Sequence, residues 1–178
     1  MLGIGRPGVL KTEVDSHKVE GSLHPEKQYA CLYWIQHLHK SGSQLNDDGE
    51  VHQFLKEHLL HWLEALGWMQ KVSEGFHAIV SLESMMAQRC PRLSAFVHDM
   101  KRFVLYHRSA IELAPLQTYC SALVFSPAAS LVKRQFQSQK PLWMPDGQAV
   151  GRRLGKGAAD ALAPVGYQRR GLLAVRQA

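Results

Sequence analysis

The sequence contains no apolar run that approaches the roughly 20 residues needed to cross a bilayer. Its start, MLGIGRPGVLK, also lacks the basic region and the apolar core of roughly 7–15 residues that mark a secretory signal. We therefore expect no membrane partner and a cytoplasmic location.

Cysteine is scarce, with three residues in a chain of 178. Cys31, Cys90 and Cys120 are widely spaced, odd in number, and form no CxxC pair. A disulfide framework needs an even set, and a zinc knuckle needs close pairs. We expect reduced, packed thiols that hold no metal.

Two glycine-rich stretches resemble phosphate-binding motifs only in part. GIGRPG, at Gly3–Gly8, matches G-x-G-x-x-G, but no strand precedes it and no amphipathic helix follows. GRRLGKG, at Gly151–Gly157, is one residue shorter than a P-loop and has glycine where Ser or Thr would hold magnesium. The sequence therefore predicts no cofactor, no catalytic or cofactor-binding residue and no small-molecule ligand.

Positive charge is concentrated near the end of the chain. Of the net charge of +6, +4 comes from the residues after Met144, and the rest of the chain is an ordinary mixture of acids and bases. The alternative hypothesis is nucleic-acid binding through Arg152, Arg153, Arg169 and Arg170. Few aromatic residues stand between them to stack on bases, so nucleic acid is the less favoured partner.

Hydrophobic periodicity predicts an all-α bundle of about five or six helices. We expect an irregular lead-in over 1–24, a helical domain over 25–144 and a disordered basic tail over 145–178. The stretch LQTYCSALVF is compatible with a short helix or a short extended segment. The other predicted helices cover 25–40, 51–69, a segment from an N-cap at Ser73 to the RCP triplet, 92–113, and a segment that starts at Pro127.

The helix over 51–69 is the most regular segment, and it carries three histidines. Its apolar residues recur at helical spacing and should form one face of an amphipathic helix. Glu57, Leu60 and Glu64 are expected to lie away from that face. The expected inward positions on this helix are Val51, Phe54, Leu55, His58, Leu59, Trp62, Leu66 and Met69.

His58 and His61 raise the possibility of a metal-dependent enzyme. The zinc-protease motif H-E-x-x-H places its two histidines four residues apart on one face, whereas these two are three apart in the inverted order EHLLH. We interpret His58 as a histidine at the edge of the core. A catalytic metal site is the alternative, and it requires stoichiometric zinc in the purified protein.

Four strings in order carry a likeness to a known family. They are PEKQYACLYWIQHLHKSG, VHQFLKEHLLHWLEALGWMQKVSEG, LSAFVHDMKRFVLYHRSAIELAPLQTYCSALVFSP and SLVKRQF. From about Val9 to Trp143 the chain resembles the helical segment of fungal NACHT–WD40-repeat proteins, which are signal-transducing NTPases of the heterokaryon or vegetative incompatibility type. In that family an NTPase core precedes this segment, and a propeller of WD repeats follows it and senses a ligand.

The resemblance implies a non-catalytic coupling segment whose partners are proteins, either further copies of the chain or full-length relatives. It implies that Met1 follows the NTPase, so that no nucleotide-binding residue carries over. No GH…WD blade signature follows Trp143, and 151–178 is rich in arginine where the first WD repeat is expected. We interpret this tail as a frame-shifted or misspliced reading of a former propeller blade.

Overall fold

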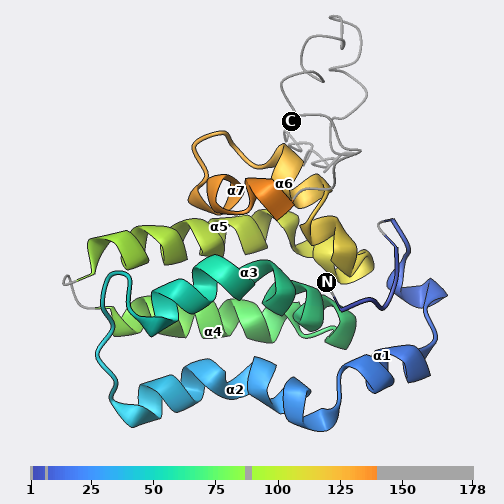
Figure 1. Cartoon of the computed structure of the whole chain (residues 1–178), viewed down its shortest axis with the longest axis horizontal. Coiled ribbons are helices and arrows are strands. Elements are labelled where there is room, and N and C mark those ends of the chain that lie inside the picture. Colours follow the sequence, from blue (N-terminus) through green and yellow to red (C-terminus); the bar gives the residue numbers. More distant parts are fainter. Residues whose placement is uncertain (1, 7, 87–89, 140–178) are drawn as a thin grey trace, which may run out of the picture. The chain divides into compact units, whose positions relative to one another are not determined.

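The computed structural model describes residues 2–6, 8–86 and 90–139 of the chain (Figure 1). In these ranges the backbone forms helices and no strand, which confirms the all-α fold class. The tail expected over 145–178 lies outside the described residues, as do its arginines. The α-helices are α1 Ser16–Ser22, α2 Pro25–Ser41, α3 Glu50–Met69, α4 Val72–Met85, α5 Pro91–Leu113, α6 Ser121–Phe125 and α7 Leu131–Gln135, with 3-10 helices η1 Lys11–Glu13, η2 Pro115–Thr118 and η3 Gln137–Gln139.

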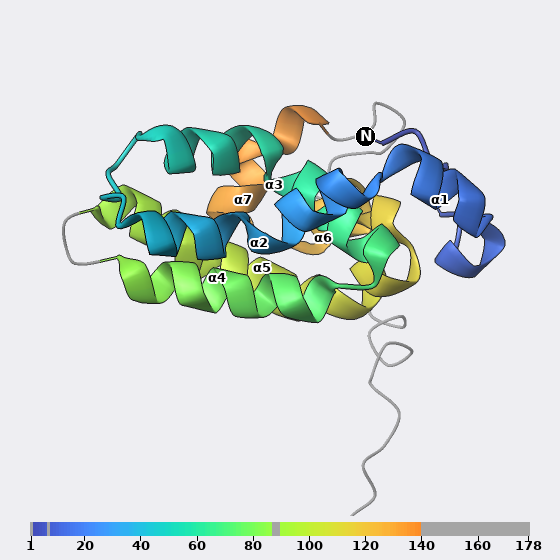
Figure 2. The ribbon, with the colours of Figure 1, turned by 90° about the horizontal axis from the view of Figure 1, so that it is seen from below.

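The long helices α3, α4 and α5 lie side by side in the middle of the molecule (Figures 1 and 2). Helix α2 packs along α4 and α3 on one side of them. The short helices α6 and α7 pack on α5 at the opposite side (Figure 1). The bundle therefore has α2 and the α6–α7 pair as its two outer layers.

Local sequence explains where the second helix begins and ends. Pro25 occupies the first turn of α2, where the missing N–H removes no helical hydrogen bond, and Glu26 follows it at the positive end of the helix dipole. Gly42 ends the helix with a φ of 65°, in the left-handed region that glycine adopts without a steric cost. The prediction for this helix is confirmed.

The first turn of α5 takes its cap from a distant loop. Its N-cap residue, Cys90, makes no side-chain cap. Asp47, in the loop between α2 and α3, instead accepts the N–H groups of Leu93 at 2.8 Å and Arg92 at 3.2 Å. Desolvation pushes the pKa of Asp47 upward, but these N–H donors and the Arg92 charge together hold that pKa below its ordinary value.

The predicted apolar face of α3 is partly wrong. Leu60 and Glu64, expected to lie away from it, are fully buried, whereas Phe54 and His58, expected on it, are exposed. Helix α3 contacts α2, α4, α5 and η2, so its C-terminal half is enclosed on all sides. A single amphipathic stripe describes a surface helix and fails for a central one.

The prediction for α5 succeeds in full. This helix buries every residue that its spacing assigned to the core, because it has one face toward α3 and α4 and another toward α6 and α7. These residues are Leu93, Phe96, Val97, Met100, Val104, His107 and Ile111.

Other helix boundaries and orientations differ from expectation. Helix α4 begins at Val72 after an N-cap at Lys71, so Ser73 lies inside it, and Val80, expected to face inward, is exposed. The last helix begins at Leu131 rather than at Pro127, because the Ser130 side chain accepts the N–H of Lys133 and caps it there. The lead-in over 1–24 is also more ordered than expected, since it contains η1 and α1.

A buried carboxylate joins three parts of the chain. Glu64, at 0% exposure, accepts the N–H of Leu2 at 3.0 Å and the hydroxyl of Tyr119 at 2.7 Å. Tyr119 is buried between η2 and α6, and this burial raises the pKa of its phenol well above the usual range. The hydroxyl therefore stays protonated and remains a donor to the carboxylate.

Replacing Tyr119 by Phe should destabilise the fold, because the buried carboxylate of Glu64 then loses one of its donors. The free energy of unfolding should fall by about 1–3 kcal/mol, measured by urea denaturation. Tyr106→Phe is the matched control, since Tyr106 is 80% exposed. Its loss of a hydroxyl should change stability by less than about 0.5 kcal/mol. Equal effects of the two variants would contradict this role for Glu64.

Gly67 marks the closest approach between α3 and its neighbours. A Cβ atom at this position would lie 2.8 Å from the carbonyl oxygen of Ile111 and 2.9 Å from the Cβ of Pro115. Backbone and proline ring have little room to move, so only glycine fits here without displacing the end of α5.

Gly67→Ala should therefore lower the free energy of unfolding by about 1–3 kcal/mol, although alanine is the better helix former. Gly21→Ala, in α1, is the control because a Cβ there meets nothing within 4 Å. The control should be neutral or stabilising by up to about 1 kcal/mol. Thermal unfolding followed by circular dichroism compares the two, and a stabilised Gly67→Ala would show that the contact is looser than described.

Candidate functional site

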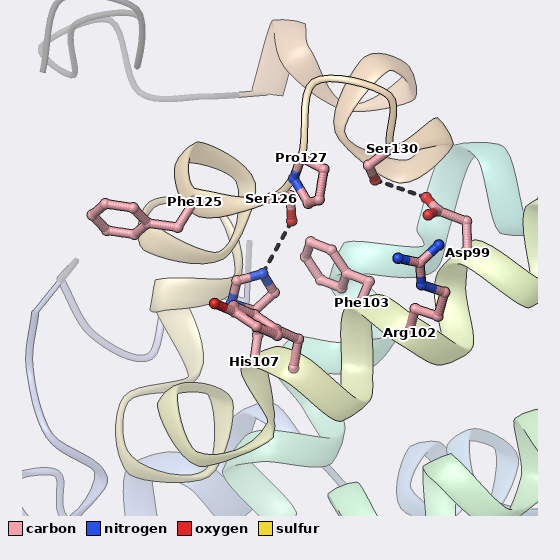
Figure 3. Close-up of a pocket in the computed structure, with 9 residues that line it drawn as sticks. Asp99, Arg102, Phe103, His107, Phe125, Ser126, Pro127 and Ser130 are labelled. Carbon is pink, nitrogen blue, oxygen red and sulfur yellow. Dashed lines mark hydrogen bonds between the residues drawn. The ribbon is translucent and has the colours of Figure 1, made fainter. Parts of the chain in front are cut away.

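A pocket lies between α5 and the segment that joins α6 to α7 (Figure 3). Its volume is about 220 Å³. Helix α5 forms one wall, because positions 99, 102, 103, 106 and 107 repeat at a spacing of three and four residues along one face. The lining residues are Asp99, Arg102, Phe103, Tyr106, His107, Phe125, Ser126, Pro127 and Ser130.

The pocket has a buried floor and an exposed aromatic rim. Phe103 and His107 are buried, and their rings are in tilted contact with centroids 5.0 Å apart. Tyr106 and Phe125, in contrast, are 80% and 68% exposed. Figure 3 shows Phe125 extending away from the floor. Two large rings thus stand in solvent beside a hollow.

A histidine and a serine in the floor are directly bonded. His107 Nε2 lies 3.0 Å from Ser126 Oγ, and that hydroxyl donates to the carbonyl of Ala122 at 2.7 Å. Burial lowers the pKa of His107, so the ring is neutral near pH 7 and its Nε2–H donates to the serine oxygen. Since the serine proton points at a backbone carbonyl, this geometry stabilises the end of α6 and does not activate a nucleophile.

The other end of the pocket is fixed by a carboxylate cap. Asp99 Oδ2 accepts the hydroxyl of Ser130 at 2.7 Å and the N–H of Val132 at 3.0 Å. Lys133 Nζ donates to the carbonyl groups of Val124 at 2.8 Å and Ser126 at 2.7 Å. Both walls are therefore held in place before anything binds.

Arg102 brings a positive charge to the rim (Figure 3). Among the described residues no ion pair or hydrogen bond is formed by its guanidinium, and Asp99 already serves as a cap. Arginine and aromatic side chains are the residues that most often dominate protein–protein binding energy. The site therefore has the chemical character of a protein-binding surface.

The predicted histidine pair is elsewhere, on α3. The rings of His58 and His61 lie 6.1 Å apart, and His58 is half-exposed with Nε2 3.7 Å from Glu57 Oε2. His61 packs near Tyr119, and burial lowers its pKa. His58 is thus on the surface and not at the edge of the core. Across the described ranges, no group of three or more His, Cys, Asp or Glu side chains is arranged to hold a metal.

The structure also shows the state of the cysteines and whether any described helix could span a membrane. Cys31, Cys90 and Cys120 are thiols that form no disulfide, and burial raises the pKa of each. In the part of the chain that the structure covers, no helix combines the length and hydropathy that a membrane span requires.

Sequence reasoning did not single out the rim residues Arg102, Tyr106 and Phe125. The only signal was that Tyr106 falls outside the inward spacing of α5. The bond between His107 and Ser126 depends on the reversal of the chain after α5, which periodicity does not encode.

Comparison with known proteins relates the chain to the vegetative incompatibility proteins of NACHT–WD40 type. One relative is the vegetative incompatibility protein HET-E-1 of Podospora anserina, to which the chain is 44% identical over 126 residues. The match covers 66% of this chain but 9% of the relative, so the chain spans only a small part of that protein's length. No family model matches the chain. No solved structure matches it either.

The buried histidine makes stability depend on pH. Because the pKa of folded His107 lies below the ordinary value of 6.5, the unfolded chain binds protons more readily as the pH falls through that value. Stability should therefore decrease from about pH 7.5 to about pH 5.5. His52 and His61, whose pKa values are also lowered, contribute in the same direction.

His107→Gln keeps a donor toward Ser126 and removes one titrating group, so it should reduce this loss of stability. Urea denaturation at the two pH values measures the difference. An unchanged pH dependence in the variant would contradict a buried, neutral His107.

Proposed function

We propose that this helical bundle is a non-catalytic interaction module, the segment that couples NTPase and propeller in proteins of NACHT–WD40 type. The similarity to HET-E-1 over 126 residues supports the relationship. The observation that carries the interaction role is the pair of exposed rings, Tyr106 and Phe125, at the mouth of a preformed pocket.

Pocket size favours a protein partner. Small-molecule sites enclose about 300–1,000 Å³. The α5 pocket, at about 220 Å³, is smaller and matches a single anchoring side chain. Leu105, which precedes Tyr106 on α5, is a further exposed apolar residue. The partner is a protein that inserts an apolar side chain and places an acidic group against Arg102.

A coupling role also needs contact surfaces on more than one side. The pocket lies on the α6–α7 side of α5, whereas α2 forms the opposite outer layer (Figure 1). Between these layers, buried contacts of α3, α4 and α5 make a continuous core. The bundle can therefore meet one partner on each side. We infer that its partners are further copies of the chain or full-length relatives.

The test is association of the full chain with itself and with full-length HET-E-1. Light scattering after size exclusion reports self-association, and titration calorimetry reports binding to HET-E-1. Tyr106→Ala combined with Phe125→Ala should weaken the association by about thirtyfold to a thousandfold, because exposed aromatic anchors each contribute about 1–2 kcal/mol.

Leu113→Ala is the matched control, because Leu113 is also on α5 and 64% exposed but does not line the pocket. It should leave association unchanged. A chain that stays monomeric and does not bind HET-E-1, or an association that the double variant leaves intact, would refute the proposed role of the pocket.

A further inference from the structure

A second and larger hollow lies on the other side of the molecule, between α2, α3 and the N-terminal residues. Its volume is about 420 Å³. Apart from three basic side chains, its lining consists of apolar and aromatic groups. The lining residues are Leu2, Leu23, Lys27, Ala30, Cys31, Trp34, Phe54, His58, His61, Trp62 and Ala65.

Aromatic rings form a continuous wall along this groove. The ring of Trp34 lies 5.1 Å from that of Phe54 and 5.8 Å from that of Trp62, and Phe54 in turn lies 5.4 Å from His58. The rings belong to two helices, α2 and α3, so the wall bridges them. Such a surface suits a hydrocarbon chain laid along it.

A direct hydrogen bond joins the two helices that line the groove. Trp62 Nε1–H donates to the carbonyl of Cys31 at 2.8 Å and so fixes α3 to α2. Leu23, before the start of α2, is buried and forms part of the lining. A ligand would therefore enter a preformed site and would not have to order it.

The lining includes basic side chains and no acidic one. No Asp or Glu is among the lining residues, whereas Lys27, His58 and His61 are. Lys27 Nζ makes only a long bond, 3.4 Å, to the carbonyl of Ser22, and it forms no ion pair among the described residues. An ammonium group has three N–H donors, so two remain for a ligand. Glu57, the acid nearest to His58 at 3.7 Å, is outside the lining.

We propose that this groove binds a free linear amphiphile with an anionic headgroup, such as a fatty carboxylate. The hydrocarbon chain lies along Trp34, Phe54 and Trp62, and the carboxylate accepts hydrogen bonds from Lys27. The volume of about 420 Å³ falls within the range of about 300–1,000 Å³ typical of small-ligand sites. The site is separate from the α5 pocket and does not depend on the proposed interaction role.

The test is titration of the full chain with monomeric dodecanoate, followed by calorimetry. We expect one saturable site, and a brominated dodecanoate should quench tryptophan fluorescence by contact with Trp34 and Trp62. Lys27→Gln should weaken binding about tenfold, which is typical of one lost charge-assisted hydrogen bond. Lys40→Gln, near the other end of α2 and outside the lining, should bind like the parent chain.

A steric variant tests the position of the chain. Ala30→Trp places a large ring in the groove and should abolish binding, whereas Ala128→Trp adds the same ring at an exposed position far along the sequence and should not. Absence of saturable binding would overturn the proposal, as would binding that neither Lys27→Gln nor Ala30→Trp affects. Sedimentation with anionic vesicles, lost in Ala30→Trp and without binding of monomeric dodecanoate, would overturn it in favour of a membrane-contact surface.

Discussion

The fold depends on keeping the donors of one buried carboxylate. Glu64 lies in the enclosed C-terminal half of helix α3, where an unbonded charge would cost several kcal/mol. Two of its donors are the N–H of Leu2 and the hydroxyl of Tyr119, which are separated from it by 62 and 55 residues. The N-terminal segment and the link between η2 and α6 are therefore fixed by the same group. Gly67, one turn further along α3, lets this helix approach the end of α5 closely. This approach allows Tyr119 to reach Glu64.

Sequence periodicity could predict α5 and α2 because each has a simple environment. Helix α5 buries the residues at its three-to-four spacing, and α2 begins at Pro25 and stops before Gly42, as the backbone preferences of proline and glycine require. Helix α3 could not be predicted in the same way. A glutamate in its pattern indicates an exposed side, yet Glu64 is buried because distant donors compensate it. These donors come from distant parts of the chain, so the sequence around Glu64 does not reveal them.

The candidate sites were hidden from the sequence for a related reason. Tyr106 and Phe125 are aromatic residues exposed to solvent. The sequence alone does not distinguish an exposed aromatic ring from a buried one, because exposure depends on which helices pack against it. The groove beside α2 similarly depends on the bond from Trp62 to Cys31, 31 residues apart. His58 and His61 drew attention as possible ligands, but the structure makes them part of a mainly aromatic wall. The all-α class, in contrast, follows from spacing alone.

Two helices are capped by aspartates from other elements, and this couples the movement of those elements. Helices α5 and α7 each begin with N–H groups bonded to an aspartate from another element, Asp47 for the first and Asp99 for the second. Helix α5 has 23 residues and spans about 35 Å, with the loop that carries Asp47 at its start and the pocket over its middle. A displacement of that loop would pull on the first turn of α5 and reach the α6–α7 layer through Asp99. Helix α5 can thus act as a stiff lever that is fixed to the loop between α2 and α3 at its first turn and to the α6–α7 layer at Asp99.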